Sequence, residues 1–91
     1  MKVNVRYAAQ ARHAAGCSSE TIELASPCSI SELLLKIAKQ KEGLRNLLLD
    51  SNGNANGALL VFVNEEQISS RSPQQINDGD DVEILSPISG G

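Results

Sequence analysis

The stretch "SISELLLKIAKQ" (residues 29–40) decides the fold, because here the apolar spacing changes from a period of two to a period near 3.6. The apolar side chains recur three and four positions apart, which places them on one helical face. They are Ile30, Leu33, Leu34, Ile37 and Ala38. Ser29 and Glu32 have the S-x-x-E spacing of a capping box at a helix start, and Gly43 is a candidate helix stop. The pattern predicts one principal helix from about Ile30 to Glu42.

Segments on both sides of this helix have the patterns of β-strands. "KVNVRYA" (2–8) and "ETIELA" (20–25) alternate apolar and polar residues, which is typical of half-buried strands. The loop between them, "HAAGCSS" (13–19), has Gly16 as its turn residue, and we expect the two strands to form a hairpin. After the helix, "ALLVFV" (58–63) reads as a central strand, and "VEILS" (82–86) reads as the last strand.

Smaller features complete the predicted order of elements. "LRNLLLD" (44–50) is a candidate short second helix, "QIS" (67–69) a candidate short strand, and "NDGDD" (77–81) a strong turn signal. A β-β-α-β-β chain must place its helix across one face of the sheet. The expected fold is therefore α+β and of the β-grasp, or ubiquitin-like, kind, with one principal helix on a mixed sheet.

The proposed strand registers predict which side chains form the core. We expect six side chains to be buried, namely Val5, Ile22, Leu33, Ile37, Val61 and Ile84. In the same registers Leu60, Phe62 and Leu85 point away from the helix and form an outward apolar patch. Such patches mark interaction sites. The alternative is that loops cover this part of the surface.

Length and composition limit the possible functions. A chain of 91 residues with 41% hydrophobic content makes one small domain. Its net charge of −3 argues against nucleic-acid binding, which needs a surplus of lysine and arginine. No apolar run is long enough to cross a membrane, and the alternating N-terminus does not resemble a signal peptide. We therefore expect a cytoplasmic protein. Cys17 and Cys28 match no metal or redox spacing and are expected to be reduced thiols.

No catalytic group stands out among the side chains. The single histidine, His13, falls in an expected loop or strand end without a positioned partner. No cluster has the spacing of metal ligands, so we expect no metal site. "SNGNANG" (51–57) lacks the pattern of a phosphate-binding loop. The acidic residues at Asp78, Asp80, Asp81 and Glu83 are either a solvated turn or a docking site for a basic partner.

The sequence finishes on "PISGG" (87–91), which we expect to form a flexible tail after a β-grasp domain of residues 1–86. Pro87 has no N–H for strand pairing. Because glycine lacks a Cβ, a tail of this kind can enter a narrow tunnel. The carboxylate of Gly91 could attack the α-phosphate of ATP, and the resulting acyl-adenylate would react with a sulfur or amine nucleophile. A partner enzyme must supply the nucleotide site.

Four stretches together carry a resemblance to a known family. They are "VNVRYAAQAR" (3–12), "SISELLLKIAKQ" (29–40), "LLVFVNEEQI" (59–68) and "INDGDDVEILSPISGG" (76–91). The chain resembles the ubiquitin-like sulfur carriers, and "GDDVEI…SPISGG" resembles the branch that comprises the small subunits of molybdopterin synthase. The carriers for thiazole (thiamine) formation and for tRNA thiolation are less similar at "PISGG" and are the alternative kind of sulfur carrier. Many relatives have a bulky aromatic pair late in the first strand, where this chain has Tyr7-Ala8. Many also have Pro-Pro before the tail, where this chain has Ser86-Pro87.

The resemblance implies a role for the tail. Gly91 would be adenylated by a ubiquitin-activating-type enzyme that uses ATP, and then converted to a thiocarboxylate. The large synthase subunit would hold the tail residues Pro87, Ile88, Ser89 and Gly90, supply the catalytic side chains and pass the sulfur to precursor Z. The family match also implies that Arg12 contributes to the partner interface. No permanently bound cofactor is implied.

Two other classes of function remain open from the sequence. The same carboxylate could conjugate the chain to lysine side chains, as in a protein modifier. Alternatively, the domain could be a non-catalytic β-grasp interaction module in which the two glycines have no role. A thiocarboxylate, an isopeptide-linked adduct or function without the tail would distinguish the three.

Overall fold

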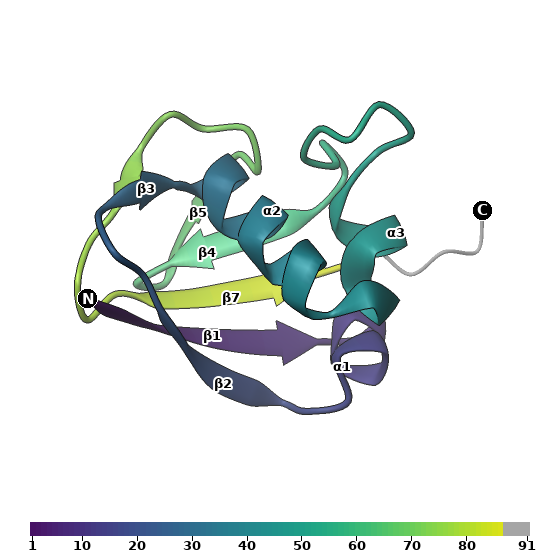
Figure 1. The fold of residues 1–91 in the computed structure, drawn as a ribbon, viewed down its shortest axis with the longest axis horizontal. Helices are drawn as coiled ribbons and strands as arrows, with labels where there is room; N and C mark the ends of the chain where they lie inside the picture. Colours follow the sequence, from purple (N-terminus) through teal and green to yellow (C-terminus); the bar gives the residue numbers. More distant parts are fainter. Residues whose placement is uncertain (87–91) are drawn as a thin grey trace.

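The computed structural model describes residues 1–86 (Figure 1). The predicted tail residues Pro87, Ile88, Ser89, Gly90 and Gly91 lie outside the described residues. The helical elements are α1 (Gln10–Ala15), α2 (Ile30–Gln40), the 3₁₀ turn η1 (Glu42–Leu44) and α3 (Arg45–Leu48). The strands are β1 (Lys2–Ala8), β2 (Ser19–Glu23), β3 (Cys28–Ser29), β4 (Leu60–Val63), β5 (Glu66–Ile68), β6 (Gln75–Ile76) and β7 (Asp81–Leu85).

Five of the strands form one mixed sheet in the order β2-β1-β7-β4-β5. β1 and β7 are parallel neighbours at its centre, and the other pairs are antiparallel. α2 lies across one face of this sheet (Figure 1). The short strands β3 and β6 pair separately. This arrangement confirms the predicted β-grasp fold with one principal helix.

The core lies between α2 and the sheet and is built mainly from aliphatic side chains, with Tyr7 as an aromatic member. All six side chains predicted to be inside are buried: Val5, Ile22, Leu33, Ile37, Val61 and Ile84. Burial alternates along β1 and β7, with every second residue inside. The predicted strand registers are therefore correct, since a slip by one residue would have placed these side chains on the opposite face.

The start of α2 is as predicted, and its end is not. The Ser29 Oγ accepts a hydrogen bond from the Glu32 N–H at 3.2 Å, and the Ser29 N–H donates to Glu32 Oε1 at 3.0 Å. These two bonds make the expected capping box. The helix ends at Gln40, because Lys41 has extended backbone angles and leads into η1. Gly43 is not the helix stop. A Cβ built there would lie 2.9 Å from the Ala14 carbonyl oxygen, so glycine permits the close approach of α1.

The first two strands pair antiparallel, which confirms the predicted hairpin, but the segment between them is not the brief loop that was expected. Residues Gln10–Ala15 form the helix α1, which packs Ala11 into the core. Gly16 ends α1 in a left-handed conformation (φ 77°), and its N–H donates to the Arg12 carbonyl. His13, expected in a loop or strand end, is therefore an exposed helical residue. The predicted short second helix is present as η1 and α3.

Candidate partner interface on the outer sheet face

The outer face of the sheet, opposite α2, has an apolar row at one end. Leu85 is the register partner of Ala8 on β1 and of Leu60 on β4, so the three side chains lie side by side across the three strands. Leu60 has 36% of its surface exposed, and the other two are half-buried. Leu60 and Leu85 therefore occupy the outward position that the sequence predicted. The exposure of Leu60 shows that no loop of residues 1–86 covers it.

Phe62 forms the boundary between this apolar row and the polar part of the face. It is half-buried and lies opposite Glu83 on one side and Gln67 on the other. Arg6 is the register partner of Glu83 on β1. Phe62 is one of the two aromatic residues of the chain, and it points away from the core. The predicted patch of Leu60, Phe62 and Leu85 is thus continuous across β4 and β7.

Beyond Phe62 the outer face becomes polar, and its side chains are bonded to one another. The Thr21 hydroxyl donates to Asn4 Oδ1 at 3.3 Å, and the Asn4 amide donates to Asp81 Oδ1 at 3.1 Å. Asn64 accepts from the Asp81 N–H at 3.0 Å and donates to Asp80 Oδ1 at 3.0 Å. A ladder of hydrogen bonds therefore crosses the sheet at the end away from Leu85.

The same bonds bear on the two interpretations of the acidic cluster. Asp78 accepts a hydrogen bond from the Lys2 N–H at 2.7 Å, and Asp80 accepts one from the Asn77 N–H at 2.8 Å. With Asp81, three of the four acidic residues use a carboxylate oxygen inside the chain. These bonds favour the turn-forming interpretation over a docking site.

Strand direction places α1 next to the apolar row. Because β1 and β7 are parallel, both strands end at the same edge of the sheet, and α1 follows β1 there (Figure 1). Arg12 is exposed on α1, and its side chain forms no hydrogen bond or ion pair with residues 1–86. Arg12 therefore belongs to the same edge as Leu85, on α1 rather than on the sheet face itself.

The structure adds two residues at this edge that the sequence patterns did not single out. Ala9, between β1 and α1, has φ 56° and ψ −131°, a conformation that residues with a Cβ rarely adopt. Ser86, the last described residue, is 2% exposed, and its hydroxyl finds no hydrogen-bond partner within residues 1–86. Neither an alanine nor a serine carries a local pattern that would have indicated this.

The Tyr7 side chain links β1 to β2, and through Glu20 to Lys41 at the end of α2. Its hydroxyl donates to Glu20 Oε2 at 2.6 Å, and Lys41 Nζ lies 3.5 Å from the same oxygen. Burial, and then the hydrogen bond and negative charge of Glu20, raise the pKa of the Tyr7 hydroxyl well above its ordinary value. Tyr7 is therefore a neutral structural donor and not an acid–base group.

Cys17 and Cys28 are half-buried and unpaired, and burial raises the pKa of the Cys28 thiol. Within residues 1–86 no three His, Cys, Asp or Glu side chains gather where they could hold a metal ion. None of the helices in this range has the length and apolar character needed to cross a bilayer.

The chain is similar to known proteins in sequence and in fold. The "Molybdopterin synthase sulfur carrier subunit" of Chlamydomonas reinhardtii is 28% identical over 91 residues, which cover 100% of both chains. SAMP1 from Haloferax volcanii has a TM-score of 0.86 at 16% identity, with 100% of both chains covered, and this likeness bears on the fold alone. A chain in the complex of subunits 1 and 2 of molybdopterin-converting factor from Helicobacter pylori also matches, with a TM-score of 0.59 and 25% identity. The match covers 100% of this chain and 100% of that chain.

The family comparison extends over nearly the whole sequence. The ThiS family model matches residues 5–91, which include the strand β7 and the terminal "PISGG". The chain therefore belongs to the ThiS family.

Proposed function

We propose that this chain is the sulfur carrier subunit of a molybdopterin synthase. One observation carries the proposal: the apolar row of Ala8, Leu85 and Leu60 lies at the strand end from which β7 continues into "PISGG". A partner that covers this row is placed to receive the next residues of the chain. The family membership and the name of the algal relative support the same role.

The proposed chemistry takes place at the carboxylate of Gly91. A carboxylate oxygen attacks the α-phosphorus of ATP, which releases pyrophosphate and leaves an acyl-adenylate. Hydrosulfide, or a sulfur donor equivalent to it, then attacks the carbonyl carbon, and the C–O bond to AMP breaks. The products are AMP, a proton and a thiocarboxylate on Gly91. The large synthase subunit would use this sulfur to build the dithiolene of molybdopterin from precursor Z.

Partner enzymes supply the rest of the machinery in this proposal. A ubiquitin-activating-type enzyme holds ATP, and the large synthase subunit holds the pterin. The Helicobacter pylori match is a complex of two subunits, which supports an interface with a larger partner. The exposed Leu60, together with Phe62, Leu85 and Arg12, would form the part of that interface contributed by this chain.

The proposal is tested by shortening or thickening the tail. Deleting Gly91 withdraws the reacting carbon by about 3.3 Å, and a misplacement of about 1 Å can already lower a rate roughly a hundredfold. Gly90→Val adds a branched side chain where the backbone must pass closely. We expect both variants to lose thiocarboxylate formation by at least about a hundredfold, with unchanged melting temperatures. Ser51→Val, at an exposed loop position, is the matched control.

The measurement is intact-mass spectrometry after incubation with the activating enzyme, ATP and sulfide, followed by a molybdopterin assay with the large subunit. Replacement of one oxygen by sulfur in the wild type, and its loss in both variants, is the expected result. Wild-type rates for the Gly91 deletion would refute the carrier role. Isopeptide-linked adducts without a thiocarboxylate would instead identify a protein modifier.

A further inference from the structure

A second exposed apolar side chain lies on the helix side of the molecule, away from the outer sheet face. Leu35 on α2 has 37% of its surface exposed and, with Leu60, is one of two large apolar residues exposed within the described range. It borders a cleft of about 150 Å³. The lining residues are Leu35, Ala38, Lys39, Arg45, Leu49 and Gly53. We call this the helix-side cleft.

The helices α2 and α3 form two walls of this cleft. Leu35, Ala38 and Lys39 are three and four positions apart on α2, so they share one face of that helix. Arg45 and Leu49 have the same four-residue spacing along and just after α3. An apolar cavity of about 150 Å³ can hold a group the size of benzene. The cleft therefore has room for one aromatic or branched aliphatic side chain.

The rim of the cleft carries positive charge that the chain leaves unpaired. Lys39 and Arg45 are both exposed, and neither forms an ion pair or side-chain hydrogen bond with residues 1–86. This is notable in a chain of net charge −3. The lining residues of the cleft include no carboxylate, and Asp50, which follows Leu49, is already paired with Arg71 at 3.2 Å. The charge at the rim is therefore complementary to an anionic ligand.

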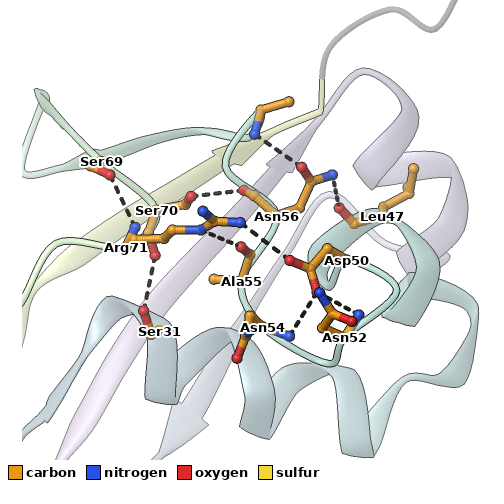
Figure 2. Close-up of polar contacts among 11 residues, drawn as sticks. Ser31, Leu47, Asp50, Asn52, Asn54, Ala55, Asn56, Ser69, Ser70 and Arg71 are labelled. Atoms are coloured by element: carbon orange, nitrogen blue, oxygen red, sulfur yellow. Dashed lines mark hydrogen bonds and ion pairs between the residues drawn. The ribbon is translucent and has the colours of Figure 1, made fainter.

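The loop that closes the cleft is fixed by Asp50 and Arg71, although its sequence is rich in asparagine and glycine (Figure 2). Asp50 Oδ1 accepts hydrogen bonds from the Asn52 N–H at 2.8 Å and the Asn54 N–H at 3.0 Å. Arg71 Nε donates to the Ala55 carbonyl at 2.8 Å. One arginine thus bridges both ends of the turn that contains Gly53.

Further bonds attach this loop to its surroundings (Figure 2). The Ser70 hydroxyl donates to the Asn56 carbonyl at 2.7 Å, and the Asn56 amide donates to the Leu47 carbonyl at 3.0 Å. The Ser31 hydroxyl on α2 donates to the Ser70 carbonyl at 3.2 Å. The wall of the cleft is therefore ordered before any ligand arrives, which lowers the entropic cost of binding.

We propose that the helix-side cleft binds an acidic peptide segment of a second protein. One aromatic or branched aliphatic side chain of the segment enters the cleft beside Leu35, and flanking carboxylates contact Lys39 and Arg45. α2 separates this cleft from the sheet, so the outer face around Leu60 stays accessible. Two proteins can then bind the chain at the same time, one on each side. This inference does not depend on the chemistry of Gly91.

The test uses the full chain labelled with ¹⁵N and the peptide acetyl-Glu-Asp-Phe-Asp-Glu-amide as the probe. We expect saturable shifts of the Leu35, Lys39, Arg45 and Gly53 amide signals. Arg45→Glu should weaken binding by about tenfold or more, since it replaces an attraction by a repulsion. Arg6→Glu makes the same charge change on the outer sheet face and should leave the affinity within about twofold.

One further variant of the chain and two altered peptides separate the contributions of the cleft. Arg71→Gln should weaken binding without altering Lys39 or Arg45, because it releases the loop wall while the folded spectrum persists. Peptides with alanine in place of phenylalanine, or lysine in place of the acids, should bind at least about tenfold more weakly. Absence of saturable shifts, equal effects of Arg6→Glu and Arg45→Glu, or equal binding of the basic peptide would overturn the proposal. So would sedimentation showing a dimer that Arg45→Glu dissolves, which would assign the cleft to a second copy.

Discussion

The two ends of the outer sheet face differ in how far the chain satisfies its own side chains. At the end near Asn64, a ladder of side-chain hydrogen bonds runs from Thr21 through Asn4 and Asp81. At the other end, Ala8, Leu85 and Leu60 lie side by side with apolar surface facing outward. The polar side chains at the first end are satisfied by hydrogen bonds within the domain. The apolar side chains at the other end are stabilised only when another surface covers them.

The backbone shows the same contrast. The two-residue hairpin loop between β4 and β5 has positive φ at Asn64 (51°) and Glu65 (72°), a pattern for which asparagine is well suited. At the apolar end, Ala9 has φ 56° with ψ −131°, where no side chain relieves the strain. Backbone strain of this kind gathers near functional sites. The polar end of the face is therefore structural, whereas the apolar end is available to a partner.

The largest expected effect comes from placing a charge in the outward apolar patch. Phe62→Asp should weaken binding of the large subunit of a molybdopterin synthase by about thirtyfold or more, because aromatic residues dominate interface energetics. Stability should change little, since Phe62 faces away from the core. Isothermal titration calorimetry and thermal melting measure the two quantities.

Gln67→Asp is the matched control, because Gln67 is the cross-strand partner of Phe62 on the same face and is exposed. It should bind nearly as tightly as the wild type. If Phe62→Asp unfolds the chain, Phe62 contributes to the core, and the outer face is not divided as described. Equal losses for both variants would show that charge alone, and not the apolar surface, decides binding.

The next effect concerns the polar end and should appear in stability rather than in binding. Asn64→Ala removes the hydrogen bonds to Asp80 and Asp81 and leaves a non-asparagine residue at positive φ. We expect the free energy of unfolding to fall by about 1–3 kcal/mol. Urea titration measures it, with Asn46→Ala, an exposed residue of α3, as the control. A loss of partner affinity with unchanged stability would reverse the assignment of the two ends.

The smallest effect tests the strain at the apolar end. Ala9→Gly removes the Cβ from a conformation that glycine adopts readily, and it should raise the free energy of unfolding by about 1 kcal/mol after the entropic cost of glycine is included. Ala15→Gly, at the last residue of α1, should instead lower it by about 0.5–1 kcal/mol. Matched urea titrations compare the two. Destabilisation by Ala9→Gly would show that the junction holds no strain.

Most of the fold follows from local patterns in the sequence. Period-two alternation in β1 and β7 predicted their buried faces, and the spacing from Ile30 onward, with the Ser29 cap, predicted the start of α2. α1 was not predictable, because a six-residue helix without a side-chain cap leaves almost no periodic signal. Gly43 resembled a helix stop because its real constraint, the approach of Ala14, comes from a segment distant in the chain.

The candidate site was predictable only in part, for the same reason. The alternation of side chains between the two faces of a strand is a local pattern, and it predicted that Leu60, Phe62 and Leu85 share one face. The meeting of Leu85 with Ala8 depends on the parallel pairing of β1 and β7, which no short pattern encodes. The helix-side cleft joins α2, α3 and a loop anchored by Arg71, and its parts become neighbours only in the folded chain.

The central pairing of β1 with β7 also has a consequence during protein synthesis. β1 leaves the ribosome first, but it cannot complete its pairing until β7 has been synthesised, because Val5 pairs with Val82 at the middle of the sheet. Until then β1 has only β2 as a neighbour, and its other edge remains unpaired. Contacts so distant in sequence form slowly and expose edges to other chains. The sheet is therefore completed only after translation has passed β7, so a nascent chain that still lacks this strand cannot form the finished domain.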